Sequence, residues 1–599
     1  MSATQTGTAA GGGGNGTATG GQAQAAPGEG SAINPELENE MLSRYLFAVL
    51  GCLAGVLIIW RCINVLVRYV RQVTCLNNDT QRYFAAPSSK VSFFKKTIQY
   101  APILGKRHNR EFALSSAVNM GTLPTRLQLV VLAGYFATNV AFCVLNVPFH
   151  ENFDTASDQL RNRTGVLAVV NMVPLFLMAG RNNPLINWLG ISFDTFNLLH
   201  RWLGRIVILE SIAHVLAYWI GSAAEKGFPA VFQRTISVPY MMWGFVATCA
   251  FIAIGIQAMS VSRHAFYETF KIVHIALAAL AVAGVWYHLV LKHLPQIKYL
   301  YPVIALWCLD RLARFLRVMY TNVGAGGTKT LVEALPGNAC RVTVTMARPW
   351  TFKPGQHAYL YMPSISGLQS HPFSVAWSEE AEDLHGEKLP MDRTDVLAMR
   401  KTSMSFVIRA RAGFTGNLYK KASECKGGKL LTRCLVEGPY GGMHSLQSYG
   451  TVMLFAGGVG ITQAVPHVRE LVAGYGNGTV AARKIVLVWI IQSPEHLEWI
   501  RPWMTEILAM ERRRDVLRIM LFVSRPRSTK EIHSPSATVQ MFPGRPNVDT
   551  LLGMEMEQQV GAMGVSVCGP GALSDEVRRA VRNRQYQGTI DFVEEAFSW

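Results

Sequence analysis

The stretch FNLLHRWLGRIVILESIAHVLAYW, from Phe196 to Trp219, is long and apolar enough to cross a membrane, yet it carries His200 and His214. The two histidines are fourteen residues apart. On an α-helix this separation is about four turns and a rise of roughly 21 Å, so both imidazoles lie on one face, one near each side of the hydrocarbon layer. Ionisable side chains inside a membrane span are costly and usually face the bundle interior, where they have a function.

A second stretch, FKIVHIALAALAVAGVWYHLVL from Phe270 to Leu291, repeats the same spacing with His274 and His288. One apolar stretch, Val238 to Met259, lies between the two, so the two histidine-bearing helices run in the same direction. Like-placed histidines are therefore expected to meet in two pairs, at two levels of the membrane.

The two expected pairs are His200 with His274 and His214 with His288. Two facing imidazoles on neighbouring helices can ligate a haem iron axially, and helix bundles commonly hold such cofactors in their cores. A single histidine in an apolar span is more often a hydrogen-bonded structural residue. Two spans that repeat one spacing favour two stacked b-type haems, each with two histidine ligands.

The composition indicates a membrane protein with a soluble part. Of 599 residues, 50% are hydrophobic and 16% are charged, and this length exceeds that of one domain. The net charge of +18 accompanies neither a basic helix nor a base-stacking motif, and much of it lies in loops beside apolar spans, so no nucleic acid is expected as a partner. The ten cysteines include no CxxC spacing and predict neither a disulfide framework nor a zinc site.

Seven spans are expected, near residues 45–67, 127–147, 165–180, 196–219, 238–259, 270–291 and 299–319. Residues 1–42 are rich in Gly, Ala and Thr and predict a disordered tail. Basic residues follow the first span, which places the tail outside and the 70–126 loop in the cytosol. The chain beyond the seventh span is then cytosolic, with His200 and His274 as the inner pair.

Arg201 and Arg205 lie beside the inner pair. They could neutralise haem propionates, or they could be part of the cationic excess that cytosolic ends of spans carry, and both interpretations stay open. His150 and His293, in loops expected outside, are isolated and are interpreted as surface residues.

From about residue 325 the long apolar runs give way to short alternating ones, CRVTVTM, HAYLYMP and MSFVIRA, which predict a small antiparallel β-barrel over 325–447. The segment HPFSV, from His371 to Val375, lies between two of these strands. The segment RARAGFTG, from Arg409 to Gly416, joins a strand to a helix start, where free backbone N–H groups can hold a pyrophosphate. An ordinary turn of the barrel would also explain this segment.

Residues 448–599 predict a second soluble domain, an α/β doubly wound parallel sheet. The buried run TVMLFA, from Thr451 to Ala456, leads into GGVGIT, from Gly457 to Thr462, and then into a helix, an arrangement that lets the backbone approach a phosphate. Further strand runs follow at 485–491, 519–523 and 565–568, and CGPG, from Cys568 to Gly571, closes the last. Ligands of such sheets lie at the carboxyl ends of the strands.

Taken in order, these segments resemble the fungal ferric and cupric reductases of the flavocytochrome b type, relatives of the NADPH oxidases. The resemblance covers roughly residues 120–599 and rests on HRWLGR at His200, the four histidines, HPFS, GGVGIT, CGPG and the aromatic C-terminus at Trp599. It implies an all-α transmembrane haem domain over 127–320, after a first span and basic loop over 43–126. The rest would be a ferredoxin–NADP reductase-like module with a FAD-binding β-barrel domain and an NAD(P)-binding domain.

The resemblance also implies roles for individual residues. The flavin ring and its pyrophosphate would contact His371, Pro372, Phe373, Ser374, Val375, Arg409, Gly413 and Thr415. The nicotinamide dinucleotide would contact Gly457, Gly458, Val459, Gly460, Ile461, Thr462, Cys568 and Gly569. Cys568 would lie by the nicotinamide as a catalytic residue, and Trp599 would stack on the isoalloxazine until the nicotinamide displaces it.

Relatives often carry an arginine for the 2′-phosphate after the second strand of the dinucleotide domain, where this chain has Gln492. Ser524 and Arg525, after the next strand, could supply that contact, which favours NADPH over NADH. The expected cofactors are therefore FAD, two b haems and NADPH.

The implied function is that of a transmembrane ferric or cupric reductase, which moves electrons from cytosolic NADPH through FAD and two haems to extracytoplasmic Fe(III) for iron uptake. A superoxide-generating NADPH oxidase shares every carrier and differs in its acceptor. A non-catalytic scaffold would have lost a haem histidine or the glycine turn, and this chain keeps both. The expected location is the plasma membrane, with the vacuole or the endoplasmic reticulum as alternatives. Expected partners are the lipid bilayer, ferric or cupric chelates, and an iron-uptake permease or oxidase.

Overall fold

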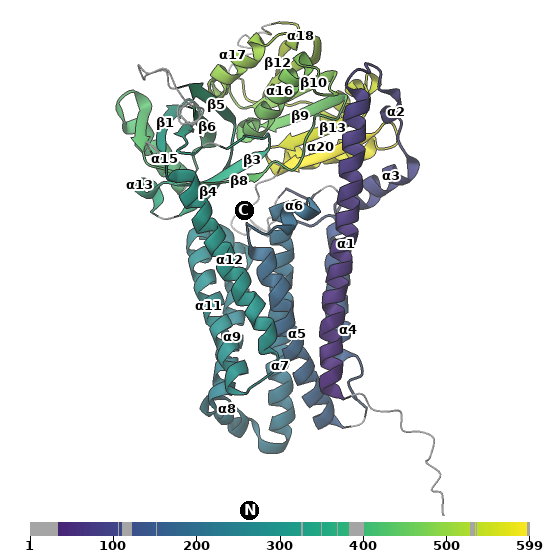
Figure 1. Ribbon diagram of the computed structural model, residues 1–599, viewed down its shortest axis with the longest axis vertical. Coiled ribbons are helices and arrows are strands. Elements are labelled where there is room, and N and C mark those ends of the chain that lie inside the picture. The colour runs from purple at the N-terminus through teal and green to yellow at the C-terminus, as the bar shows by residue number, and fades with distance from the viewer. Residues whose placement is uncertain are drawn as a thin grey trace, which may run out of the picture.

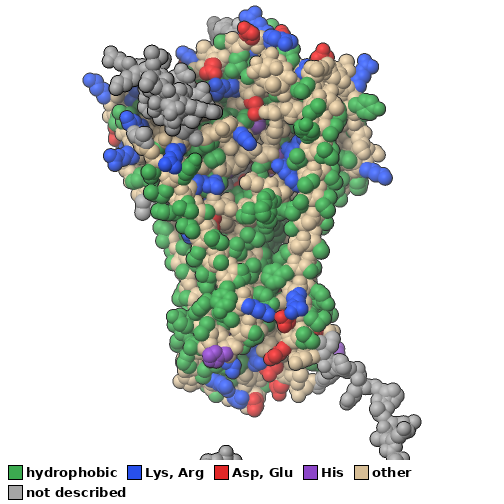
Figure 2. Space-filling view, in the orientation of Figure 1, with side chains coloured by type: hydrophobic (Ala, Val, Ile, Leu, Met, Phe, Trp, Pro, Cys, Tyr) green, Lys and Arg blue, Asp and Glu red, His purple; other side chains and the backbone are tan. Residues whose placement is uncertain are grey.

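The computed structural model describes residues 34–105, 107–110, 122–150, 152–324, 327–348, 350–367, 369–382, 400–411, 413–526, 534 and 536–595. They form a long helical bundle with a soluble module of sheets and helices at one end (Figure 1). On the face shown in Figure 2, apolar side chains cover the flank of the bundle, and charged side chains gather at its far end and on the module. A bilayer around the bundle requires this distribution.

Six helices of the described chain are long and apolar enough to span a membrane: α1 (Pro35–Cys75), α4 (Arg126–Val144), α5 (Phe153–Ala179), α7 (Phe193–Lys226), α9 (Pro239–Gln257) and α11 (Tyr267–Leu291). The expected seventh span is α12 (Ile297–Asn322), which lies beside the others but carries Asp310, Arg311, Arg314 and Arg317 in its second half. These charges lie where α12 leaves the bundle for the module. Short helices α6 (Leu185–Leu189), α8 (Phe228–Ser237) and α10 (Ser260–Ala265) connect the long ones.

In the bundle, α5 packs against α7, and α9 packs against α11. Their shared core includes Val169, Met172, Leu203, Val207, Ala247, Phe251, Ala281 and Val285. A buried polar network adds to this packing: Tyr135 of α4 donates to Asn171 of α5 (2.6 Å). Asn171 in turn donates to Asn139 of α4 (2.7 Å) and to Glu210 of α7 (2.9 Å). Such hydrogen bonds help to hold helices together where no water competes.

The first helix is 41 residues long, so it extends about 60 Å, roughly twice the thickness of a hydrocarbon core. It begins at Pro35 and continues beyond the expected end of the span, because no Gly or Pro interrupts residues 68–75. The extension reaches the module, where Arg71 donates to Ser448 (2.8 Å) and lies over the ring of Tyr449 at 3.9 Å. The helix therefore joins the bundle to the second soluble domain.

The basic stretch after α1 packs on the same domain, through α2 (Arg82–Ala85), α3 (Ser89–Phe94) and a π-helical turn (Lys95–Gln99). Lys95 pairs with Asp591 at 2.6 Å. The backbone N–H groups of residues 108–110 donate to the carboxylate of Asp575, in helix α20 (Gly571–Asn583), at 2.9–3.0 Å. The sequence indicated a basic loop here but not this contact, which joins residues more than 450 positions apart.

The first soluble domain is antiparallel, as expected, and its strands form two sheets where a single small barrel was predicted. One has the order β5-β6-β2-β1-β7 and the other β4-β3-β8. The strands are β1 (Lys329–Leu335), β2 (Ala339–Thr345), β3 (Gln356–Tyr361), β4 (Ser370–Ser374), β5 (Trp377–Glu382), β6 (Arg400–Arg409), β7 (Lys429–Thr432) and β8 (Leu435–Gly441). Helices α13 (Pro363–Ser366) and α15 (Phe414–Glu424) complete the domain, whose core includes Val342, Leu360, Phe406 and Leu418.

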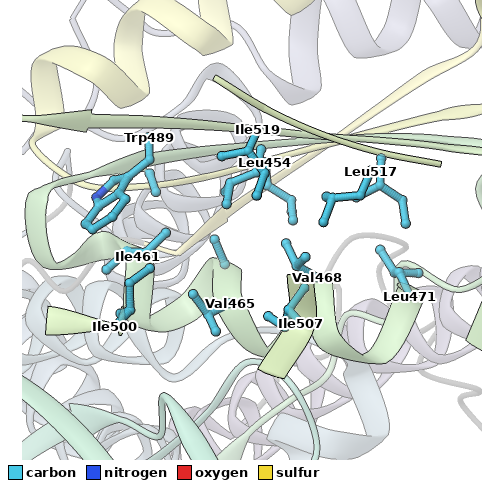
Figure 3. Close-up of a cluster of buried hydrophobic side chains, with 14 of the residues drawn as sticks. Leu454, Ile461, Val465, Val468, Leu471, Trp489, Ile500, Ile507, Leu517 and Ile519 are labelled. Carbon is cyan, nitrogen blue, oxygen red and sulfur yellow. The ribbon is translucent and has the colours of Figure 1, made fainter. Parts of the chain in front are cut away.

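The second soluble domain is the expected parallel sheet, in the order β12-β11-β10-β9-β13-β14. Its strands are β9 (Thr451–Gly457), β10 (Lys484–Ile491), β11 (Leu517–Val523), β12 (Val539–Pro543), β13 (Met563–Cys568) and β14 (Ile590–Glu595), of which β12 and β14 were not predicted. Helices α16 (Ile461–Gly476) and α17 (Arg501–Ala509) cover one face, and α19 (Val548–Glu557) and α20 cover the other. Figure 3 shows Leu454 and Ile519 of the sheet above Val465 and Val468 of α16. The strand order reverses between β9 and β13, the place where such sheets bind ligands.

Candidate functional site

The structure brings together the histidine pairs that the spacing predicted. His200 of α7 and His274 of α11 face each other with ring centroids 6.2 Å apart and planes at 68°. His214 and His288 repeat this arrangement at 6.2 Å and 84°. They lie fourteen residues farther along α7 and α11, which both run from the module towards the far end of the bundle (Figure 1). The pair nearer the module is called the inner pair below, and the other is called the outer pair.

The spacing of each pair fits two imidazoles on one metal atom. A metal–imidazole nitrogen bond is about 2 Å long, so two rings that share one atom have centroids roughly 6 Å apart once the ring radii are added. Both pairs meet this condition. The donor set, two imidazoles on opposite helices, is also the one that an axially ligated haem uses.

Backbone carbonyls orient three of the four rings. The Nδ1 atoms face carbonyl oxygens as follows: His200 faces Leu175 (3.0 Å), His214 faces Arg161 (2.7 Å) and His288 faces Tyr240 (2.8 Å). A carbonyl oxygen only accepts, so each Nδ1 carries the proton and each Nε2 keeps a lone pair for a metal. The Nδ1 of His274 is buried and has no hydrogen-bond partner within the described chain.

Two glycines make room for the outer pair. A Cβ atom on Gly165 of α5 would lie 2.6 Å from Nδ1 of His214, and one on Gly244 of α9 would lie 2.6 Å from Nδ1 of His288. Real Cβ atoms do not approach so closely, so any larger residue would displace the ring. The sequence analysis missed both glycines, although a glycine inside an apolar span often marks the close approach of another helix.

Arg201 and Arg205 lie in the part of α7 nearest the module. The guanidinium of Arg205 stacks on the ring of Trp202 at 4.5 Å, and Nε of Arg201 donates to the carbonyl of Asn197 (3.4 Å).

The HPFSV segment forms β4 and the residue after it, and pairs with β3. The ring of His371 stacks on that of Phe414 at 4.5 Å and 12°. Its Nε2 lies 3.8 Å from Glu268 of α11, which comes six residues before His274. Burial lowers the pKa of His371 although Glu268 opposes the shift, so the ring is neutral at pH 7. The expected flavin segment, Pro372 to Val375 included, therefore lies at the end of the bundle that holds the inner pair.

The expected turn from a strand into a helix is present between β6 and α15. Gly413 has φ +76°, which glycine adopts without strain, and the hydroxyl of Thr415 accepts the N–H of Arg411 at 3.0 Å. Arg409, at the end of β6, donates to Gln492 of the second domain at 3.4 Å. The candidate pyrophosphate site thus lies at the boundary between the two soluble domains.

The GGVG and CGPG turns pack against each other at the carboxyl ends of the neighbouring strands β9 and β13. A Cβ atom on Gly457 would lie 2.5 Å from a proline side chain of the other turn, and one on Gly460 would collide with the carbonyl of Cys568. A Cβ atom on Gly569 would lie 2.9 Å from Gly457. Gly458, at φ +56°, faces open space. Three of these four glycines therefore allow one turn to approach the other closely.

The residues after the first turn begin α16. Ile461 is fully buried beneath the sheet (Figure 3), so it offers a ligand only its backbone. The hydroxyl of Thr462 donates to the carbonyl of Val459 at 2.9 Å. This hydrogen bond stabilises the turn, and the backbone N–H groups at the start of α16 lie beside it.

Cys568 ends β13 and is 5% exposed. Burial raises the pKa of its thiol to about 12, and Glu595 and Glu594 add to the shift. The thiol is therefore neutral at physiological pH, and a neutral thiol is a poor nucleophile.

The residues considered for 2′-phosphate binding lie together at the ends of β10 and β11. The backbone N–H of Ser524 donates to Ile491 (2.8 Å), and that of Arg525 donates to Gln492 (3.2 Å). The side chain of Arg525 is exposed. Trp599 lies outside the described residues, so its expected place against the flavin stays a prediction.

A mostly apolar cavity of ≈ 360 Å³ lies between α5 and α7 at the end of the bundle far from the module. Its lining includes Phe149, His150, Phe153, Leu160, Ala213 and Ala217. Ala213 and Ala217 flank His214 along α7, so the cavity lies beside the outer pair. His150, expected to be an isolated surface residue, contributes to this wall.

Three family models match consecutive parts of the chain: "Ferric reductase like transmembrane component" over residues 164–285, "FAD-binding domain" over 325–387 and "Ferric reductase NAD binding domain" over 449–582. They divide the chain as the fold does, into the histidine-bearing bundle, the antiparallel domain and the parallel domain.

Curated relatives cover most of the chain. Ferric reductase transmembrane component 3 of Saccharomyces cerevisiae is 28% identical over 563 residues, 86% of this chain and 74% of that protein. Ferric/cupric reductase transmembrane component 2 of the same yeast is 28% identical and covers 80% of this chain and 67% of that one. Ferric/cupric reductase transmembrane component 1 of Candida albicans is 25% identical and covers 88% of this chain and 69% of that protein. The chain thus combines a ferric reductase-like transmembrane component with FAD-binding and NAD-binding domains, and it is similar to ferric and ferric/cupric reductases over most of its length.

Proposed function

We propose that the protein is a transmembrane ferric reductase that moves electrons from NADPH, on the module side of the membrane, to Fe(III) on the opposite side. Cu(II) is a second acceptor of the same kind. The supporting observation is the stacking of two histidine pairs along α7 and α11, each with the spacing of two imidazoles on one iron atom. The flavin strand β4 adjoins this stack, since His371 lies against Glu268 of α11.

When bound, FAD would convert a two-electron hydride into single electrons, and two b haems would carry these electrons across the hydrocarbon layer. The residues of the chain hold and orient these groups. Carbonyls fix the rings of His200, His214 and His288 with Nε2 directed away from the carbonyl and free for iron. With two histidine ligands, each iron would keep no open position, which would favour electron transfer over oxygen binding at the metal.

At the donor end, the first turn of α16 offers backbone N–H groups to the dinucleotide pyrophosphate. Arg525, exposed beside Gln492, binds the 2′-phosphate and favours NADPH over NADH. The neutral thiol of Cys568 packs against the nicotinamide at the carboxyl end of β13.

The relatives and the distribution of basic residues support the proposed acceptor and the proposed membrane. The relatives named above are ferric or ferric/cupric reductases, which favours Fe(III) over the oxygen that a superoxide-generating oxidase would use. The basic residues on the module side of α1 favour a cytosolic module and an external N-terminus. In the plasma membrane this topology delivers electrons to extracellular chelates, with an iron-uptake permease or oxidase as the partner.

A sealed-vesicle assay tests the proposal. Purified protein is reconstituted with the module outside, an impermeant ferric chelate is trapped inside, and NADPH is added with superoxide dismutase present. Ferrous chelate should form inside the vesicles at a rate that the dismutase does not change. Loss of the signal with dismutase, together with oxygen consumption, would support the oxidase instead. Absence of electron flow to either acceptor would contradict both.

A further inference from the structure

The flavin-side sheet meets the bundle at one buried carboxylate. Glu437 of β8 has no exposed surface. The hydroxyl of Tyr440 donates to its Oε1 at 2.6 Å, and the hydroxyl of Tyr361 in β3 donates to its Oε2. Both carboxylate oxygens are therefore held in fixed directions.

Two arginines from different parts of the bundle reach this carboxylate. Arg314 of α12 donates to its two oxygens at 3.3 and 3.4 Å. Arg181, which follows α5, lies 3.7 Å from Oε2, and its guanidinium covers the ring of Tyr359 in β3 at 3.6 Å. Burial raises the pKa of Glu437, but Arg314 and Arg181 outweigh burial and hold the pKa below its ordinary value, so the carboxylate is charged at neutral pH.

The end of α12 also completes β8, which is an edge strand of its sheet. The side chain of Asn322 accepts the backbone N–H of Val436 at 2.9 Å and donates to its carbonyl at 2.8 Å. Arg317 donates to the carbonyl of Pro439 at 3.1 Å. An edge strand otherwise leaves such backbone groups unpaired, so these bonds fix β8 to α12 at both sides of Glu437.

This joint connects the two places between which electrons would pass. On the module side, β3 lies between β8 and β4, the strand that carries His371. On the bundle side, Arg181 follows α5, whose carbonyl at Leu175 holds the ring of His200. The contacts of Glu437 therefore set the separation between the flavin strand and the inner pair.

We propose that Glu437 is a positioning residue for electron transfer, which fixes β4 at its working distance from the His200–His274 pair by sharing its buried charge between Arg181 and Arg314. The inference rests on the proposed function. In reactions that depend on positioning, a displacement of about 1 Å can lower the rate roughly 100-fold. Removing the carboxylate charge also leaves two half-buried guanidinium groups without their counter-ion, which protein interiors tolerate poorly.

The substitution Glu437→Gln tests this role in the full-length, cofactor-loaded protein, because it keeps the size of the side chain and removes its charge. In anaerobic stopped-flow mixing with NADPH, flavin reduction should be unchanged and haem reduction should slow about tenfold or more. The haem absorption spectrum should not change. Glu437→Asp, which keeps the charge, should restore part of the rate.

Glu333→Gln is the matched control. Glu333 is a half-buried carboxylate of the same domain, and its partners, Arg341 at 3.6 Å and Lys429 at 3.1 Å, lie in that domain too. The control should leave flavin reduction and haem reduction unchanged.

Hydrogen exchange measures the joint independently of electron flow. Residues 435–441 and 314–322 should exchange faster in Glu437→Gln than in the wild type. Unchanged haem reduction or unchanged hydrogen exchange in Glu437→Gln would overturn the assignment. An equal loss of flavin reduction would also overturn it, because such a loss indicates a general role of Glu437 in folding. If wild-type haem receives no electrons from reduced flavin, the proposed function fails, whereas the exchange rates still decide whether Glu437 holds β8 on α12.

Discussion

His214 of α7 and His288 of α11 lie with their ring centroids 6.2 Å apart, and each ring rests on a glycine of the helix packed beside it. The glycines are Gly165 of α5 and Gly244 of α9. Each ring is thus enclosed by a backbone carbonyl, a glycine and the facing imidazole. The packing around each ring therefore leaves no room for a larger residue in place of the glycine or for a different orientation of the ring.

Replacing Gly165 or Gly244 with alanine should displace the histidine that rests on it. We expect the affinity for the outer haem to fall roughly tenfold. Loss of a contact that orients a metal-ligating histidine commonly lowers metal affinity by about that factor or more. The haem content per chain, measured by absorbance after purification, checks this. Gly134 of α4 has open space around it, so Gly134→Ala should keep the wild-type haem content. Full haem retention in Gly165→Ala and Gly244→Ala would contradict the account.

The two levels of histidines should be separable by mutation. His214→Ala should abolish reduction of an external ferric chelate while NADPH still reduces the flavin and the inner haem. His200→Ala should stop electrons at the flavin, because the inner pair lies nearer the module. Anaerobic absorbance changes after addition of NADPH distinguish flavin from haem reduction. Normal chelate reduction by His214→Ala would mean that electrons do not pass through the outer pair.

The Cys568 thiol should not titrate in the working pH range. Its pKa is raised from 9.0 to about 12, so at pH 8 only about one thiol in ten thousand is ionised. The rate of hydride transfer should therefore not change between pH 7 and 9 because of this group, and iodoacetamide should modify Cys568 far more slowly than the half-buried Cys425. Because the folded pKa lies above the unfolded one, the contribution of the thiol to stability is complete below pH 9 and is lost between about pH 9 and 12. Rapid alkylation of Cys568 at pH 8 would show that the thiol is ionised.

Arg525 should determine the preference for NADPH. Arg525→Ala should raise the KM for NADPH about tenfold, since a charge-assisted contact with a phosphate is lost, and should leave the KM for NADH unchanged. Steady-state flavin reduction with each nucleotide measures both values. Arg514 is also exposed but lies before β11, at the opposite edge of the sheet, so Arg514→Ala serves as the control. An equal rise for both nucleotides would remove Arg525 from 2′-phosphate recognition.

The histidine pairs and both soluble folds could be predicted because their signals are local in sequence. A repeated spacing on two apolar helices sets the pairing of His200 and His274, and alternating or continuous apolar runs distinguish the two sheets. The glycine turn at 457 was located correctly, but its packing partner was not, because Gly569 comes from a strand more than a hundred residues later.

Other features depend on contacts that no local pattern specifies. The first helix was expected to end near residue 67 because basic residues follow, yet Arg71 is buried against Tyr449 far along the chain. No local pattern singles out Glu437, because its partners reach it only when α12 and the residue after α5 meet β8. Tertiary partners, rather than propensity, decide such positions.

The most direct test of the central claim is the haem count and ligation of the purified wild-type protein. We expect two b haems per chain, both with the low-spin electron paramagnetic resonance signal of two histidine ligands, and both reduced by NADPH without oxygen. One haem per chain, or a high-spin signal from an iron with an open position, would contradict the assignment of His200 with His274 and of His214 with His288 as two axial ligand pairs.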